Sequence, residues 1–103
     1  MLVLSEVNRT QLTEFCRKWN IAELAVFGSA LRPDFGAASD VDLLVTFARE
    51  SHPSLFDLVH MEEELEEILA RPVDLVSRRG IESSPNYIRR KAILGSAQVL
   101  YAT

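Results

Sequence analysis

Several features that often reveal a function are scarce in this chain of 103 residues. It holds a single cysteine, Cys16, which excludes an internal disulfide and fits a reducing compartment. No apolar run approaches the roughly 20 residues that a membrane-spanning helix needs. The opening segment, MLVLSEVNRT, lacks the basic region and the cleavage site of a secretory leader. These absences predict a cytoplasmic protein without membrane contact, in which Cys16 is a small core residue.

Positive charge is also in short supply. Asp and Glu number 15 against 11 Lys and Arg, and the net charge of -4 provides no overall basic field for nucleic acid. The acidity does not exclude a phosphate ligand, because a bound cation can invert the local sign of the field. The chain has neither repeats nor a linker, so residues 1–103 are expected to form one domain. A second lobe that closed over a ligand would have to come from another chain.

Hydrophobic periodicity predicts the order helix, strand, turn, strand, helix, strand, helix. The connection between the second and third strands contains a helix, so these strands should be parallel, whereas the short loop after the first strand makes it antiparallel to the second. We therefore expect an α+β fold, with helices flanking a small mixed sheet of strand order 1-2-3. The predicted segments are a helix at Ser5–Trp19, strands at Ile21–Phe27, Asp40–Phe47 and Pro72–Val76, a helix through Leu55–Leu69, a polar stretch at Ser77–Ser84, a helix from Pro85 to about Leu94 that Gly95 ends, and a tail, Gln98–Tyr101, compatible with a short edge strand.

Three aspartates mark the candidate site. Asp40 and Asp42 lie two residues apart at the start of the second strand, so their side chains should leave the same face of the sheet. Two adjacent carboxylates repel each other and are costly to bury, which makes a purely structural role a poor explanation. Asp74 lies near the start of the third strand. If the parallel strands are neighbours, the three acids meet at one end of the sheet, where Gly28-Ser29 also arrives from the first strand.

This combination has a chemical meaning. Mg²⁺ favours hard oxygen ligands, and two divalent ions roughly 3.5–4 Å apart can clamp the attacking and leaving oxygens of a phosphoryl-type displacement. The Gly28-Ser29 step offers backbone N–H groups without a blocking side chain, together with one hydroxyl for a phosphate oxygen. Arg32 is a candidate donor of charge-assisted hydrogen bonds to the same phosphates. A plain surface role for Arg32 is equally open.

The segment GSALRPDFGAASDVDLLV, followed by PVDLV, resembles the minimal nucleotidyltransferases of the DNA polymerase β superfamily. The family pattern is Gly-Ser-x-x-Arg, then Ser-Asp-x-Asp-Leu, then a third Asp on a later strand. The resemblance covers residues 21–76 and continues in the tail NYIRRKAILGSAQVLYAT. One departure is Pro33, where the family often has Gly. The residues that match the pattern are Gly28, Ser29, Arg32, Ser39, Asp40, Asp42, Leu43 and Asp74.

The resemblance implies ATP as the donor and Mg²⁺ as the cofactor of a two-metal site, with AMP transferred and pyrophosphate released. It implies that Asp40 and Asp42 bind both metals, and that Asp74 binds the catalytic metal and helps to activate the acceptor hydroxyl. Gly28 and Ser29 would hold the phosphates. Single-domain members of this size are usually antitoxins that assemble with a HEPN-domain toxin, an RNase, and many transfer AMP to a tyrosine of that toxin. The implied function is adenylyl transfer to a partner HEPN toxin.

Two other functions are compatible with the same residues. An antitoxin could neutralise its partner by binding alone, with a metal site that is vestigial or structural. A small-molecule nucleotidyltransferase would share the motifs, but such enzymes normally carry an additional helical domain for the acceptor, for which this chain is too short.

The remaining conspicuous residues are interpreted as structural. The glutamates at positions 62–64, 66 and 67 are expected to form a mostly solvated helix face. The basic cluster Arg89-Arg90-Lys91 fits a surface role better than a contact with a nucleotide or a partner. His52 and His60 have no partner at metal-ligand spacing. Aromatic side chains expected to serve packing are Trp19, Tyr87 and Tyr101.

Overall fold

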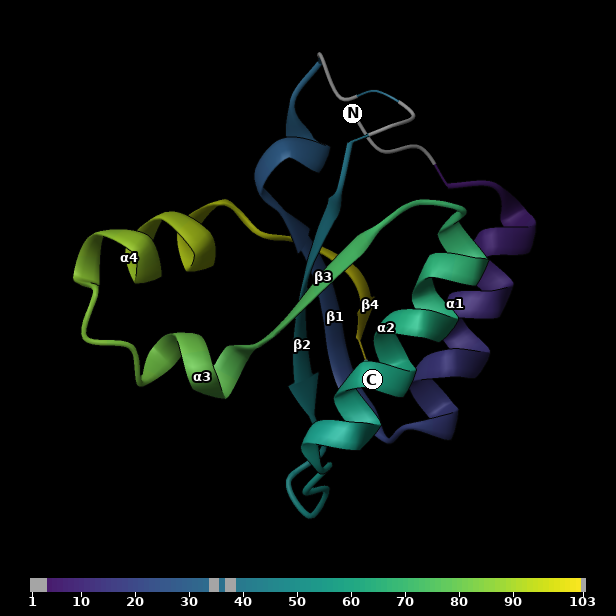
Figure 1. Ribbon diagram of the computed structural model, residues 1–103, viewed down its shortest axis with the longest axis horizontal. Helices are drawn as coiled ribbons and strands as arrows, with labels where there is room; N and C mark the ends of the chain where they lie inside the picture. Colours follow the sequence, from purple (N-terminus) through teal and green to yellow (C-terminus); the bar gives the residue numbers. More distant parts are fainter. Residues whose placement is uncertain (1–3, 34–35, 37–38, 103) are drawn as a thin grey trace.

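The computed structural model describes residues 4–33, 36 and 39–102 (Figure 1). Its elements are α1 (Glu6–Lys18), β1 (Ile21–Phe27), the 3-10 turn η1 (Gly28–Leu31), β2 (Val41–Phe47), α2 (Leu55–Leu69), β3 (Val73–Ser77), α3 (Arg78–Glu82), α4 (Tyr87–Ser96) and β4 (Gln98–Ala102). The predicted α+β class is confirmed. Within these described residues, no helix is both long and apolar enough to cross a membrane.

The four strands form one mixed sheet of order β3-β2-β1-β4. β1 is antiparallel to both β2 and β4, and β2 is parallel to β3. The predicted order of the first three strands and both predicted directions are therefore correct. The tail forms β4 on the outer side of β1, so the sheet is one strand wider than the predicted order 1-2-3.

Helices cover both faces of the sheet. Figure 1 shows α1 and α2 on one face and α3 and α4 on the other. Strand β2 contributes to both layers, because alternate residues of a strand point to opposite faces. Val41 and Leu43 belong to the larger core with α1 and α2. Leu44 belongs to the smaller core, which it shares with Ile81 of α3 and Ile93 of α4.

Capping residues determine where the two long helices begin and end. The Ser5 hydroxyl accepts a hydrogen bond from the Asn8 N–H at the start of α1. At α2, the Ser54 hydroxyl accepts from the Asp57 N–H at 3.2 Å, and the Asp57 carboxylate accepts from the Ser54 N–H at 2.9 Å. Helix α2 ends at Ala70, whose left-handed backbone (φ 55°) turns the chain back into β3.

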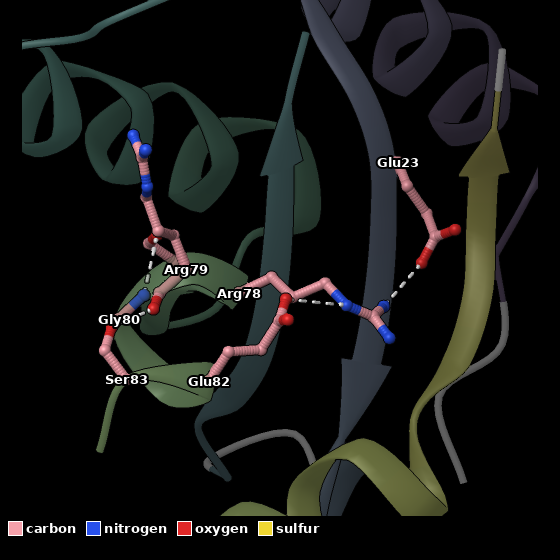
Figure 2. A network of polar contacts seen from close by, with 7 residues as sticks. Glu23, Arg78, Arg79, Gly80, Glu82 and Ser83 are labelled. Atoms are coloured by element: carbon pink, nitrogen blue, oxygen red, sulfur yellow. Dashed lines mark hydrogen bonds and ion pairs between the residues drawn. The ribbon is translucent and has the colours of Figure 1, made fainter. Parts of the chain in front are cut away.

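The polar stretch predicted after β3 contains a helix that the sequence pattern does not indicate. Helix α3 has only 5 residues, too few to show a hydrophobic period. Arg78 attaches it to the sheet: its Nη1 donates to Oε1 of Glu23 on β1 at 3.2 Å, and its Nε lies 3.4 Å from Oε1 of Glu82 (Figure 2). These contacts hold α3 against the face of the sheet that it covers.

Helix α4 begins and ends later than predicted. Asn86 is its N-cap, so Pro85 precedes the helix instead of occupying the first turn. Gly95 lies inside the last turn, because the Ala97 N–H still donates to the Ile93 carbonyl at 3.1 Å. The helical hydrogen bonds therefore continue past the glycine that was expected to end them.

The prediction of a mostly solvated glutamate face holds for Glu63, Glu66 and Glu67, which are exposed, whereas Glu62 and Glu64 are half-buried. Three of the α2 glutamates also have specific partners. Glu62 and Glu66 contact β3, as described below. Glu64 joins α2 to α1, because it forms an ion pair with Lys18 and its Oε2 accepts from Nε1–H of Trp19 at 3.1 Å. Partial burial alone would raise the pKa of Glu64, but the hydrogen bonds from Lys18 and Trp19 and the nearby positive charges outweigh it and lower that pKa.

We predict that Glu64→Gln lowers the free energy of unfolding at neutral pH by about 0.2–1 kcal/mol, the range of partly exposed ion pairs. The pKa of Glu64 is lower in the fold than its ordinary value of 4.5, so the ionised side chain stabilises the fold above that pH. This contribution is lost as the pH falls from about 4.5 through the folded-state pKa. Urea unfolding at about pH 7 and about pH 3 measures the difference, which should shrink in acid. Glu67→Gln, at an exposed position, is the matched control, and a difference that persists in acid would contradict the prediction.

Cys16 should be chemically inert in the folded protein. Its side chain is 0% exposed, and burial raises the pKa of its thiol to about 12. The nucleophilic thiolate is therefore nearly absent at neutral pH. We expect a thiol reagent such as iodoacetamide to label Cys16 only as the chain unfolds, which mass spectrometry with and without urea would detect. Fast labelling of the native protein would show that the core around α1 is more open than described.

Candidate active site

The register of the sheet brings two of the predicted acids together. In the parallel pair of β2 and β3, Asp42 lies opposite Asp74. In the antiparallel pair of β1 and β2, Phe27 lies opposite Asp42, so Gly28 follows at the same end of the sheet. Alternate residues further along β2 and β3 pack in the core beneath α3 and α4, so both aspartates leave the face that these helices cover. The topology thus juxtaposes Asp42, Asp74 and Gly28 as the sequence predicts.

Gly28 lies directly against the Asp42 carboxylate. Its backbone has φ +69°, in the left-handed region that side chains disfavour, and a Cβ built on it would lie 2.5 Å from Asp42 Oδ2. No heavier residue can occupy this position unless the carboxylate moves. Glycine is therefore required twice here, once for the backbone conformation at the end of β1 and once for the space beside the acid.

A cavity of about 340 Å³ lies between this end of the sheet and α4. Its floor includes Asp42 and Asp74, and its other wall is one face of α4 with residues at helical spacing. Arg89 is the cationic member of that wall, although the sequence favoured a surface role for it. The helical spacing of Arg89 with Ile93, which is buried against the sheet, is the signal that could have placed it. The complete lining is Phe27, Gly28, Asp42, Asp74, Arg89, Ala92, Ile93 and Ser96.

The remaining predicted site residues are Asp40, Ser29 and Arg32, and the structure relates them to this cavity less directly. Asp40 is exposed, directly precedes β2 and does not line the cavity. Since the strand begins at Val41, strand alternation does not determine the direction of the Asp40 side chain. Ser29 lies in η1, and its side chain falls outside the described part of the chain. Arg32 is exposed beyond η1 and is not part of the cavity lining.

The carboxylate pair fits a divalent cation better than any neutral ligand. Two carboxylate side chains in direct register line one cavity, and the Asp42 carboxylate occupies the space that a side chain at Gly28 would need. Hard oxygen donors of this kind suit Mg²⁺. Among the residues that the structure describes, however, no three acidic, histidine or cysteine side chains converge closely enough for a metal centre. The predicted trio is therefore present here as a pair.

A larger cavity, of about 750 Å³, lies at the opposite end of the sheet, between α3 and the segment that leads into α2. Its single carboxylate, Glu82, is ion-paired with Arg78. It offers no pair of acids to a metal ion and no backbone turn like that at Gly28. The smaller cavity is therefore the candidate active site, because two paired carboxylates line it, although the other cavity has the greater volume. Ionisable residues that line the larger cavity are Arg49, His52, Arg78, Arg79 and Glu82.

Known proteins resemble this chain in sequence and in fold. Protein adenylyltransferase MntA of Thermococcus cleftensis is 37% identical over 86 residues, which cover 81% of this chain and 85% of that protein. A toxin–antitoxin crystal structure with AMP-PNP superposes with a TM-score of 0.71 at 19% identity, over 93% of this chain and 74% of that one. A complex of tri-AMPylated Shewanella oneidensis HEPN toxin with MNT antitoxin gives a TM-score of 0.66 at 18% identity, over 97% of this chain and 74% of that one.

The two structural likenesses, at under 25% identity, establish the fold. The sequence adds the family, because the profile of the nucleotidyltransferase domain matches residues 9–97, which include every candidate site residue. With the geometry of Asp42, Asp74 and Gly28, these findings agree on one assignment: the chain belongs to the nucleotidyltransferase domain family.

Proposed function

We propose that this protein is an ATP- and Mg²⁺-dependent adenylyltransferase that modifies a partner protein. The observation that carries the proposal is the in-register pair of Asp42 and Asp74 in a cavity that also contains Gly28 and Arg89. Two adjacent carboxylates repel each other, so a sheet gains nothing from them without a cation. The similarity to a protein named adenylyltransferase supports AMP as the transferred group.

Each residue has a role in this proposal. Asp42 and Asp74 hold the divalent cation, and Asp40, two residues before Asp42, supplies the third carboxylate. The metal, when bound, neutralises phosphate charge and draws electron density from phosphorus. Gly28 and Ser29 receive the phosphates through their backbone N–H groups.

Two arginines and one aspartate complete the scheme. Arg32 and Arg89 balance the charge of the triphosphate. Asp74 accepts the proton of the acceptor hydroxyl, whose oxygen then bonds to the α-phosphorus of ATP. The bond from that phosphorus to its bridging oxygen breaks, and pyrophosphate leaves with the electron pair. The products are the adenylylated acceptor and pyrophosphate.

The acceptor in this proposal is a tyrosine of a HEPN-domain toxin, so the protein acts as an antitoxin within a hetero-oligomer. Support comes from the similar structures, which are a toxin–antitoxin and an AMPylated HEPN toxin with its MNT antitoxin. The cavity is compatible with this as well, since its described lining contains groups for a nucleotide and, among those described side chains, Ser96 as the one hydroxyl. An acceptor hydroxyl is therefore expected to come from another molecule.

The proposal is tested by incubating the protein with ATP, Mg²⁺ and the HEPN-domain protein encoded beside it. We expect mass spectrometry to show the toxin gaining mass in AMP units, on a tyrosine. Asp42→Asn and Asp74→Asn should each lower the rate at least about 100-fold, because each removes one charge from the metal site at nearly constant volume. Glu67→Gln removes one exposed charge from α2 and should leave the rate unchanged.

The same variants separate the alternatives. A correctly paired toxin that gains no mass with the wild-type protein would refute adenylyl transfer to that toxin. If the protein still neutralises the toxin in that case, and the Asp42→Asn variant does so equally well, neutralisation by binding alone is the better explanation. Transfer of AMP to a small hydroxylated compound but not to the toxin would identify a small-molecule nucleotidyltransferase.

Gly28→Ala should abolish nucleotide binding while the fold persists. The new Cβ would displace the Asp42 carboxylate, from which it would lie 2.5 Å away, and φ +69° would be strained by about 1–2 kcal/mol. Calorimetric titration with Mg²⁺ and AMP-PNP measures the binding, and urea unfolding measures the fold. Gly95→Ala is the matched control, because its Cβ meets nothing within 4 Å and should stabilise α4 slightly. Wild-type affinity in Gly28→Ala would argue against the proposed nucleotide position.

A further inference from the structure

Strand β3, which carries Asp74, lies at the edge of the sheet, so only one side of it pairs with another strand. Two of the N–H groups on its outer side nevertheless have side-chain partners. The Val73 N–H donates to Glu66 Oε2 and the Leu75 N–H donates to Glu62 Oε1, both at 3.0 Å. Both glutamates belong to α2, the helix that immediately precedes β3 in the chain.

The distance between the two glutamates along α2 matches the distance between the two N–H groups along β3. Glu62 and Glu66 are one helical turn apart, which is about 6 Å along the axis of α2. Val73 and Leu75 are two strand residues apart, which is about 6.6 Å along β3. Helix and strand run in opposite directions, so the earlier glutamate meets the later strand residue. The two carboxylates thus fit two successive outward N–H groups of a strand.

Asp74 lies between the two clamped residues. Because successive N–H groups of a strand point to opposite edges, its own N–H is directed towards β2. On that inner side, β2 and β3 are in register from Val41 with Val73, and the Val41 N–H donates to the Pro72 carbonyl at 2.9 Å. The backbone on either side of Asp74 is therefore held from both edges, by β2 within the sheet and by the α2 carboxylates outside it.

We propose that Glu62 and Glu66 form a carboxylate clamp that positions Asp74 opposite Asp42. These glutamates are positioning residues: they contact the β3 backbone and none of them lines the cavity. Without the clamp, β3 would be held only by its pairing with β2 and by the packing of Val73 and Leu75, and its position relative to β2 would be less tightly fixed. A shift in that position would separate the two metal-binding carboxylates. This inference rests on the proposed function, since it gives the clamp a role in metal and nucleotide binding.

The simpler explanation is that the clamp only stabilises the fold, or that it protects the strand edge from aggregation. The two explanations differ in what the loss of the clamp would change. A stabilising contact affects the free energy of unfolding alone, whereas a positioning contact also affects the affinity of the folded site for Mg²⁺ with nucleotide. The helix offers a matched control, because Glu63 and Glu67 have the same spacing and are both exposed.

The experiment compares the wild-type protein with Glu62→Ala/Glu66→Ala, Glu63→Ala/Glu67→Ala and Glu62→Gln/Glu66→Gln. The two alanine pairs remove the same charge from the same helix. The glutamine pair keeps a carbonyl oxygen that can accept the strand N–H groups. Three quantities are measured: amide hydrogen exchange at Val73 and Leu75 by NMR, the Kd for AMP-PNP in a Mg²⁺ titration, and unfolding in urea. Binding is measured well below the unfolding transition, so that only folded protein contributes.

We expect the Glu62/Glu66 alanine pair to exchange its Val73 and Leu75 amides faster and to bind Mg²⁺ with AMP-PNP about 10–100-fold more weakly, the usual effect of losing support behind a metal ligand. The glutamine pair should restore most of this affinity, and the Glu63/Glu67 pair should match the wild type. Unchanged affinity in the clamp variant, with faster exchange, would overturn the positioning role. Unchanged exchange would overturn the clamp itself. If the wild-type protein binds no Mg²⁺ with AMP-PNP, the proposed function fails, and the exchange data alone decide whether the glutamates hold β3.

Discussion

The register between two neighbouring parallel strands is the constraint on which the candidate site depends. Asp42 and Asp74 lie in direct register on neighbouring parallel strands, and the Asp42 carboxylate occupies the space that a side chain at Gly28 would need. Like charges at such a position are costly unless a cation is shared between them. The sheet keeps them together through ordinary backbone pairing, the packing of α2 and α4, and the left-handed turn at Ala70 that sets the start of β3. The fold thus places two acids at paired positions of neighbouring strands, in the lining of one cavity.

The parts that could be predicted from the sequence are those with strong periodic or topological signals. The strand directions followed from the lengths of the connections, and these directions, with the second and third strands taken as neighbours, brought Asp42, Asp74 and Gly28 to one end of the sheet. The N-cap of α1 at Ser5 agreed with the predicted start of the first helix. In these cases, one local feature determines the outcome without help from the rest of the chain.

The parts that could not be predicted depend on contacts between distant residues. In the sequence, Arg89 is one of three consecutive basic residues, and its helical spacing with Ile93 points to the cavity only once α4 is known to cover the sheet. Helix α3 is too short for a periodic signal and is held by Arg78 through Glu23, 55 residues away in sequence. The direction of Asp40 lies just outside the strand whose alternation would have determined it. A run of glutamates also looks solvated in sequence, because its partners belong to other elements.

The contacts of Glu62 and Glu66 with the β3 backbone affect whether a strand from another molecule can extend the sheet. An edge strand usually presents free N–H groups on which a strand from another molecule can add. Here Glu62 and Glu66 already occupy two of those groups on β3, so the chain itself blocks part of that edge. We therefore expect a strand that extends this sheet to add beside β4, at the other edge and two strands away from Asp42. Assembly by strand addition, if it occurs, would leave the acidic end of β2 and β3 unobstructed.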